Sequence, residues 1–408
     1  MANVQPATLR RTISLPLLVF YGVGVTVGAG IFALVGEILR IAGTAAPSAF
    51  LLSGLIAGVT GFSYALLVTV FPKAGGEAVF VNRGLGNIAG WLAGAGVTVT
   101  GIISSAAIAR AFAGYTSELF TAPAFIPIVA VILLLTLIAM WGVRESVMFA
   151  ALVTVLEVGT LIVVIAAGLP TSESLPPFSQ MVPLDAGLAA LSPVLGGAIL
   201  AFFAFIGFED IENMAEETID PARNAPRAIF WTLGITVLLY VALSVVAVSS
   251  PARDQVANSP APVAVLFEAA TGLDSSIVAA MAAVAMINGI LVQIVMAARV
   301  LYGMANEGLA PLWLAKVHAT RQTPLRATLT VSALVLVLAL SLPLVRLAEM
   351  TSLVTLAVFA LVNLSLFALG SRNAEPKLRR WRWWGLLGAA VCIAIPMAQL
   401  LGAELPAH

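Results

Sequence analysis

The sequence predicts an all-α integral membrane protein. Its 408 residues are 61% hydrophobic and only 10% charged, and the mean hydropathy of +1.05 is far too high for a soluble globular protein. The apolar runs are roughly twenty residues long and lack the alternating segments of an outer-membrane barrel, so they are predicted to be helices. The net charge is zero and no long basic tract is present, which argues against a nucleic-acid partner.

About eleven apolar runs are long enough to span a bilayer. The predicted spans are 13–35, 47–71, 87–113, 124–143, 147–169, 188–213, 228–248, 277–302, 328–345, 351–369 and 384–401. If residues 1–12 are cytoplasmic, the basic residues gather on the cytoplasmic side, and only four fall outside: Arg40, Arg110, Arg253 and Arg346. The positive-inside rule favours this orientation. The first run is too long for a secretory leader and is therefore read as an uncleaved helix.

The first predicted span contains four glycines within nine residues, from Gly22 to Gly30. Because glycine weakens a helix, this span is predicted to be interrupted near Gly28, Ala29 and Gly30. Irregular backbone at bilayer depth is tolerated only where protein or a watery cavity surrounds it, and its freed amide groups hold anions such as carboxylates. The interruption therefore predicts the substrate site of a transporter. The alternative is that the glycines only let two helices pack closely.

The sixth predicted span is apolar up to Phe208 and then strongly acidic, beginning with Glu209 and Asp210. A second break is predicted at Gly207, followed by a half-helix that descends towards the cytoplasm. The alternative is that the span ends near Phe208 and that residues 209–217 form a solvated amphipathic helix.

The two breaks lie in the first span of each half of a ten-helix unit. Breaks in matching places indicate an inverted-repeat transporter. The predicted transport core is therefore residues 13–370, with one repeat over 13–169 and the other over 188–370. Residues 371–408 are predicted to form a cytoplasmic basic loop and an eleventh helix.

The fifth predicted span contains Glu157, the only acidic residue deep in an apolar run. A charge at the centre of a membrane helix costs about 3 kcal/mol, so such a residue normally faces the bundle interior and has a function. Thr154 and Thr160 lie on the same helical face. Glu157 is predicted either to carry a proton or to accept a substrate amine. The alternative is a protonated glutamate that forms a hydrogen bond between two helices.

Several kinds of chemistry have no motif in the sequence. There is no P-loop, no metalloprotease motif and no His/Cys cluster with metal-binding spacing, so we expect neither an enzyme nor a metal or cofactor site. Cys392 is predicted to be a small core thiol. The eighth span, 277–302, offers Asn288 and Gln293 but no serine or threonine, which argues against a sodium site built on hydroxyl groups from this helix.

The motifs together resemble those of the amino acid-polyamine-organocation superfamily, specifically its bacterial amino acid permeases. The resemblance covers about residues 15–370. It rests on the stretches 24–32, 63–64, 71–79, 202–209, 215–218 and 224–227, with Pro221, Thr323 and Pro324.

The resemblance implies the five-plus-five inverted-repeat (LeuT-like) transporter fold, with helices one and six broken at the substrate. It implies that amide groups of the first break hold the substrate carboxylate, that carbonyl groups of the second hold its ammonium, and that a phenylalanine gates the site. The expected substrate-binding residues are Thr26, Val27, Gly28, Ala29, Gly30, Ile31, Phe203, Ala204, Phe205, Ile206 and Phe208. The expected proton-coupling residues are Glu157, Glu209 and Asp210.

Two features depart from the family pattern. Some proton-coupled relatives carry a lysine at a fixed distance after a motif like Arg144-Glu145-Ser146, and this chain has Glu157 there, so the lysine mechanism does not carry over. The chain also stops after eleven predicted spans, whereas many relatives have twelve, which puts the family's dimer contacts in doubt.

The sequence therefore predicts a permease of the bacterial cytoplasmic (inner) membrane that moves an amino acid by alternating access, coupled to protons rather than sodium. One alternative is a substrate-for-substrate exchanger. Another is an importer of polyamines or cationic amino acids, with Glu157, Glu209 and Asp210 forming an anionic pocket. A channel or a non-transporting receptor fits the central helix breaks less well.

Overall fold

The computed structural model describes residues 11–72, 76–141, 147–171, 176–183, 187–317, 323–372 and 376–403. Within these ranges the regular structure is helical, apart from one isolated parallel bridge between Ile13 and Thr218. Seven segments are long and apolar enough to cross a membrane, and one of them, Leu15–Val70, contains two helices. The prediction of an all-α protein with membrane-spanning helices is confirmed, whereas the number of spans and the two repeats stay predictions.

Each predicted run coincides with a helix or a series of helical segments. The long helices are α1 (Leu15–Ala42), α2 (Ala46–Val70), α4 (Asn87–Thr116), α5 (Phe125–Trp141), α6 (Val147–Thr171), α8 (Gly187–Phe202), α9 (Pro221–Ser249), α12 (Ser276–Asn306), α13 (Leu325–Ser341), α14 (Leu344–Ser371) and α16 (Arg382–Ala403). Proline within the first two residues starts α1, α2 and α9, where a missing amide hydrogen costs nothing.

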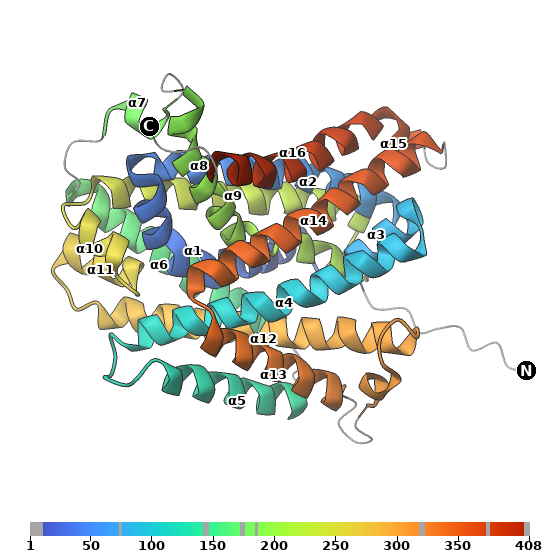
Figure 1. Ribbon diagram of the computed structural model, residues 1–408, viewed down its shortest axis with the longest axis horizontal. Helices are drawn as coiled ribbons and strands as arrows, with labels where there is room; N and C mark the ends of the chain where they lie inside the picture. The colour runs from blue at the N-terminus through green and yellow to red at the C-terminus, as the bar shows by residue number, and fades with distance from the viewer. Residues whose placement is uncertain are drawn as a thin grey trace, which may run out of the picture.

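Short helices that the hydropathy pattern did not predict connect the long ones. They are η1 (Gly43–Ala45), α3 (Gly76–Leu85), α7 (Phe178–Met181), α10 (Arg253–Asn258), α11 (Pro262–Thr271), η5 (Leu312–Ala315) and α15 (Pro376–Arg380). Figure 1 shows α3 and α15 at one end of the bundle and α10 and α11 at the other. The long helix α4 packs against α12, α14 and α3, whereas α1 packs against α9, α6 and α8.

The first predicted break is present in α1. Gly28 has φ 20° and ψ −143°, which interrupts an otherwise continuous helix. Gly30 lies so close to the second break that a Cβ atom there would stand 2.7 Å from Ala204 Cα. The glycines therefore serve both predicted purposes, since they interrupt the helix and also permit close packing.

The second break separates α8 from an acidic 3₁₀ segment. After α8 come η3 (Phe203–Phe205), extended backbone at Ile206 and then Gly207 with φ 121°. A Cβ atom on Gly207 would lie 2.9 Å from the carbonyl oxygen of Val25, so both the backbone conformation and the available space require glycine. The chain continues as η4 (Phe208–Glu217).

The alternative prediction, a solvated helix over residues 209–217, is wrong for Glu209 and Glu212. Glu209 is 8% exposed and Glu212 is fully buried. The segment η4 is amphipathic and packs against α9, α1, α2 and α3. The two glutamates are therefore removed from solvent.

The start of α1 is joined to the end of η4 by backbone hydrogen bonds. The amide groups of Thr12 and Ile13 donate to the carbonyl oxygen of Glu217, at 2.8 and 3.0 Å, and the amide of Ile219 donates to Ile13 at 2.9 Å. This short parallel pairing joins the segment that precedes the first break to the segment that follows the second break.

Some predicted features fall outside the described residues. These are residues 1–10 of the N-terminal segment, Lys73, the motif Arg144-Glu145-Ser146, and residues 373–375 and 404–408 of the C-terminal segment. Cys392 is buried as predicted and lies 3.4 Å from Thr60 Oγ1.

Candidate functional site

A small cavity lies between the two helix breaks. Its volume is about 50 Å³, which is room for about four water-sized groups. The first break contributes Thr26, Gly28, Ala29 and Gly30, and the second contributes Phe203 and Ile206. A helix that restarts after an interruption presents amide groups without partners inside the helix. The cavity is therefore lined by the residues at which the helix α1 is interrupted.

The remaining predicted binding residues are not part of this cavity's lining. Val27, Ile31 and Ala204 are buried but do not line it. Phe205 packs edge-on against Tyr240, with ring centroids 5.1 Å apart. Phe208 belongs to an aromatic group with Tyr64 and Phe359, at 5.9 and 5.5 Å. These side chains support the breaks from outside the cavity.

Glu157 of α6 lines the same cavity. It is 1% exposed, and its Oε2 atom has no hydrogen-bond partner. The nearby hydroxyl groups of α6 are committed to backbone, since Thr154 donates to the carbonyl of Phe20 at 3.1 Å and Thr160 donates to that of Leu156 at 2.7 Å. No basic side chain lines this cavity among the described residues. Glu157 thus presents an unsatisfied carboxyl oxygen to the cavity.

The other polar groups of the cavity come from α4 and α12. They are Ser104, Asn288 and Gln293. Gln293 Oε1 is buried without a hydrogen-bond partner, which leaves an acceptor for a ligand. Span eight has no serine or threonine, so the hydroxyl groups of the cavity lining come from Thr26 on α1 and Ser104 on α4.

Tyr240 of α9 is a supporting residue that the sequence did not reveal. Its Oη atom lies 2.8 Å from the carbonyl oxygen of Ala204 and 3.0 Å from that of Thr26. A phenol has one proton to donate, and here two carbonyl oxygens, one from each break, share it. The hydroxyl group therefore joins the two breaks. A tyrosine in an apolar run gives no sign of this contact, because the partners are backbone atoms far away in the sequence.

Replacing Tyr240 by Phe should loosen this junction. We expect a loss of about 1 kcal/mol of stability, because one buried hydrogen bond is removed while the ring is retained. The measurement is the melting temperature of the purified protein together with its initial rate of uptake, both of which should fall. Tyr302→Phe on α12, outside both cavities, is the matched control. An unchanged melting temperature in Tyr240→Phe would contradict the bridging role.

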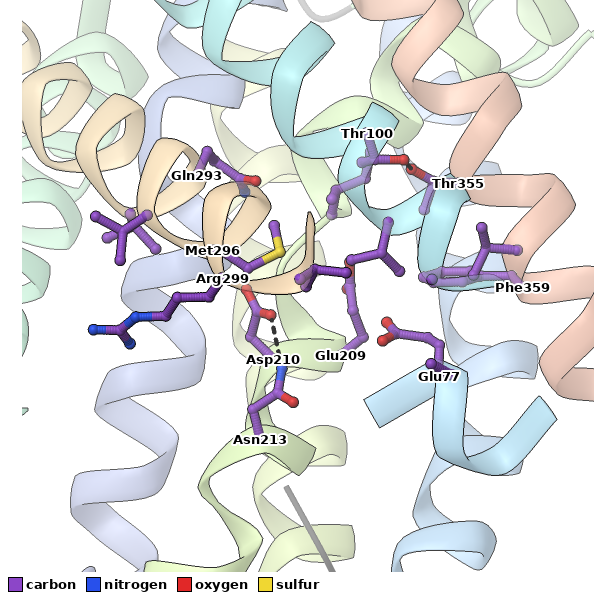
Figure 2. Close-up of a pocket in the computed structure, with 18 of the residues that line it drawn as sticks. Glu77, Thr100, Glu209, Asp210, Asn213, Gln293, Met296, Arg299, Thr355 and Phe359 are labelled. Atoms are coloured by element: carbon purple, nitrogen blue, oxygen red, sulfur yellow. Dashed lines mark hydrogen bonds between the residues drawn. The ribbon is translucent and has the colours of Figure 1, made fainter. Parts of the chain in front are cut away.

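A wider vestibule of about 460 Å³ adjoins the small cavity (Figure 2). Ile206, Val292 and Gln293 line both spaces and so form the boundary between them. Acidic residues dominate the charged lining, which consists of Glu77, Glu209, Asp210 and Arg299. Figure 2 shows the guanidinium of Arg299 extending to the side of the vestibule opposite Glu77. The vestibule therefore favours cationic groups near Glu77 and Glu209.

Glu209 is directly involved in the second break. The amide of Gly207 donates to its Oε2 atom at 2.8 Å, so the carboxyl group accepts a backbone donor that the break has released. Asp210 lies beside it, and its Oδ1 atom accepts a hydrogen bond from Asn213 at 3.3 Å (Figure 2). The structure thus places Glu209 and Asp210 in the vestibule and Glu157 in the small cavity, rather than in one pocket.

Two further buried carboxyl groups were not predicted. Glu77, at the start of α3, is 8% exposed, and the hydroxyl of Tyr64 donates to its Oε1 atom at 3.3 Å. Desolvation by burial raises the pKa of Glu77 above its ordinary value. Glu212 is fully buried and lies one helical turn beyond Glu209. The three-residue spacing of Glu209 and Glu212 is the only sequence signal that they share a face.

The described residues contain no group of three or more His, Cys, Asp or Glu side chains arranged to hold a metal ion.

Comparisons with known proteins give consistent similarities. A family profile described as "Amino acid permease" matches residues 13–406. An uncharacterized transporter of Mycobacterium tuberculosis is 33% identical over 400 residues, which cover 97% of this chain and 88% of the relative. The branched-chain amino acid permease of Bacillus subtilis is 27% identical, with 91% and 83% covered. The vacuolar cationic amino acid transporter 4 of Arabidopsis thaliana is 29% identical, with 90% and 64% covered.

Proposed function

The chain belongs to the amino acid permease family, and we propose that it moves an amino acid across the bacterial cytoplasmic membrane by alternating access, coupled to protons. Membership confirms the superfamily resemblance and the prediction that the chain is a membrane transporter and not an enzyme. The proposal adds the coupling ion, the mechanism and the site.

The observation that carries the proposal is the cavity shared by the two breaks and Glu157. Amide groups near Gly28 and Gly30 suit the carboxylate of an amino acid, and carbonyl groups of the second break suit its ammonium. The limited volume and the apolar walls at Phe203 and Ile206 favour a small neutral side chain. Because backbone groups of the protein bind the part that all amino acids share, only a few side chains of the cavity select the side chain of the substrate.

Proton coupling is proposed because Glu157 is buried beside the substrate position without a basic partner in the cavity. Ionising a carboxyl group there requires a compensating positive charge. A proton supplies that charge and enters together with the substrate, whose ammonium is held by carbonyl groups of the second break, and both leave on the cytoplasmic side. Occupancy of the cavity by substrate is thereby linked to the protonation of Glu157.

The orientation of the vestibule follows from the same proposal. The vestibule includes Glu77 of α3, and Figure 1 shows α3 and α15 at the same end of the bundle. The positive-inside rule assigns the basic residues of α15 to the cytoplasm. The conformation is therefore proposed to face inward, with the vestibule as the cytoplasmic exit path.

A second candidate substrate class is a cationic amino acid or a polyamine. The acidic lining of the vestibule favours it, because Glu77, Glu209 and Asp210 all attract ammonium groups. A long amine can extend from the small cavity past Ile206 into the vestibule, where its second charge meets these carboxyl groups. A neutral amino acid uses the small cavity alone.

Uptake into sodium-free proteoliposomes tests the function. Labelled neutral amino acids, cationic amino acids and polyamines are offered with and without an inward proton gradient. The proposal predicts saturable accumulation that collapses when a protonophore is added. Uptake that requires preloaded unlabelled substrate identifies an exchanger instead, and non-saturating current identifies a channel.

A further inference from the structure

Two buried carboxyl groups meet between α3 and η4: Glu77, which lines the vestibule, and Glu212, which does not. Glu77 and Glu212 lie within hydrogen-bonding reach of each other. Glu212 Oε1 lies 2.5 Å from the position that a Cβ atom on Gly76 would take, so α3 must begin with glycine for the two side chains to approach. Glu212 lines neither cavity, which distinguishes it from Glu157 and Glu209.

When both carboxyl groups are ionised, the pair has more hydrogen-bond acceptors than its surroundings have donors. A carboxylate only accepts hydrogen bonds, and both oxygens of Glu212 are buried without a donor. Tyr64 supplies a single donor, and it points to Glu77. One proton placed between the two carboxyl groups provides the missing donor and removes one of two buried negative charges.

One basic residue of the described chain, Arg299 on α12, lines the vestibule together with Glu77, and its guanidinium extends to the opposite side (Figure 2). The titratable groups that face the pair are Tyr64 on α2 and Glu209 and Asp210 on η4. The basic residues of the packed helices near this end, Arg83 on α3 and Arg223 and Arg227 on α9, are exposed. Lys73, just before α3, lies outside the described residues and is included in the test below.

We propose that Glu77 and Glu212 share one proton and form a second proton-binding site, separate from Glu157, that holds η4 against α3. When the proton leaves, two ionised carboxyl groups face each other in a buried space with Glu209 nearby, and their repulsion drives η4 away from α3. Because η4 begins at the second break, this movement changes the shape of the substrate's exit path. This transport role rests on the proposed function, whereas the shared proton does not.

The shared proton has a defined effect on stability. Because burial raises the pKa of Glu77, the folded protein keeps a proton at pH values at which the unfolded chain has released it. Stability therefore decreases as the pH rises from the ordinary value of a glutamate towards the raised one. Replacing either member by glutamine leaves an amide that donates to the remaining carboxylate without needing a proton.

The test measures the melting temperature of the full-length detergent-solubilised protein between about pH 5 and about pH 8. Wild type should lose stability as the pH rises, and Glu212→Gln and Glu77→Gln should each show a flatter dependence. Glu216→Gln, on the same segment, is the matched control and should follow wild type. Infrared difference spectra at neutral pH should show one carboxylic acid C=O band in wild type that both variants lack.

Two results would overturn the shared proton. The first is a wild-type pH dependence and a wild-type carboxylic acid band in both glutamine variants. The second is a matching effect of Lys73→Gln, because an ammonium group would then be the partner of the pair. Neither readout requires transport, so failure of this proposal is distinguishable from failure of the proposed function.

Discussion

Glu157→Gln will abolish the accumulation of substrate driven by a proton gradient while sparing the exchange of labelled for unlabelled substrate. Glu157 is buried in the small cavity with one oxygen unpartnered. Glutamine fills the same volume and donates a hydrogen bond but does not titrate. Binding is retained, but the cycle no longer carries a proton. We expect accumulation to fall at least about tenfold, equivalent to about 1.4 kcal/mol of coupling free energy.

The measurement compares gradient-driven uptake and counterflow exchange in the same proteoliposome preparation. Glu268→Gln, at an exposed position on α11, is the matched control and should behave as wild type. Undiminished accumulation in Glu157→Gln would remove Glu157 from the coupling mechanism. Loss of both accumulation and exchange would instead assign it to substrate binding, where its carboxylate pairs with the ammonium.

Gly30→Ala is expected to cause the second large loss of transport. A Cβ atom there would lie 2.7 Å from Ala204 Cα and 3.1 Å from its Cβ. The nearest atom belongs to the backbone of the other break, so it cannot move aside as a flexible side chain would. Overpacking of this kind costs about 1–3 kcal/mol. We expect uptake to fall by about tenfold or more, because the two breaks are forced apart at the cavity.

Gly234→Ala provides the control for this substitution. Gly234 lies inside α9, and a Cβ atom there meets nothing within 4 Å. Alanine in a helix interior is preferred over glycine by about 0.5–1 kcal/mol, so this variant should melt slightly higher and transport normally. Equal uptake by Gly30→Ala and Gly234→Ala would contradict the contact between the breaks.

The helix breaks could be predicted because they depend on local chemistry. Glycine at Gly28 and Gly207 is the residue that permits the observed positive φ angles, and clustered glycines in an apolar run are visible without a structure. The burial of Glu157 could be predicted for a similar reason, since a single charge in an apolar run has few tolerable environments. Both inferences need only the neighbouring sequence.

The rest of the site depends on which distant segments meet. Nothing near Glu77 in the sequence indicates that α3 packs on η4, so its contact with Glu212 was missed. Tyr240 was missed because its partners are carbonyl groups, which every residue has. Phe205 and Phe208 were expected to bind substrate because the resemblance implies it; in the structure they pack in aromatic groups outside the small cavity, and their role in binding stays a prediction.

The backbone pairing of residues 12 and 13 with the end of η4 has a mechanical consequence. The hydrogen bond from the amide of Thr12 to the carbonyl of Glu217 connects the residues just before α1 to the last residue of η4, and each of these segments is continuous with a break. Because the two segments are hydrogen-bonded to each other at one end and each joins a break at the other end, we expect them to move together. A displacement of η4 is therefore expected to move the N-terminal half of α1 as well, so that the two breaks change conformation together.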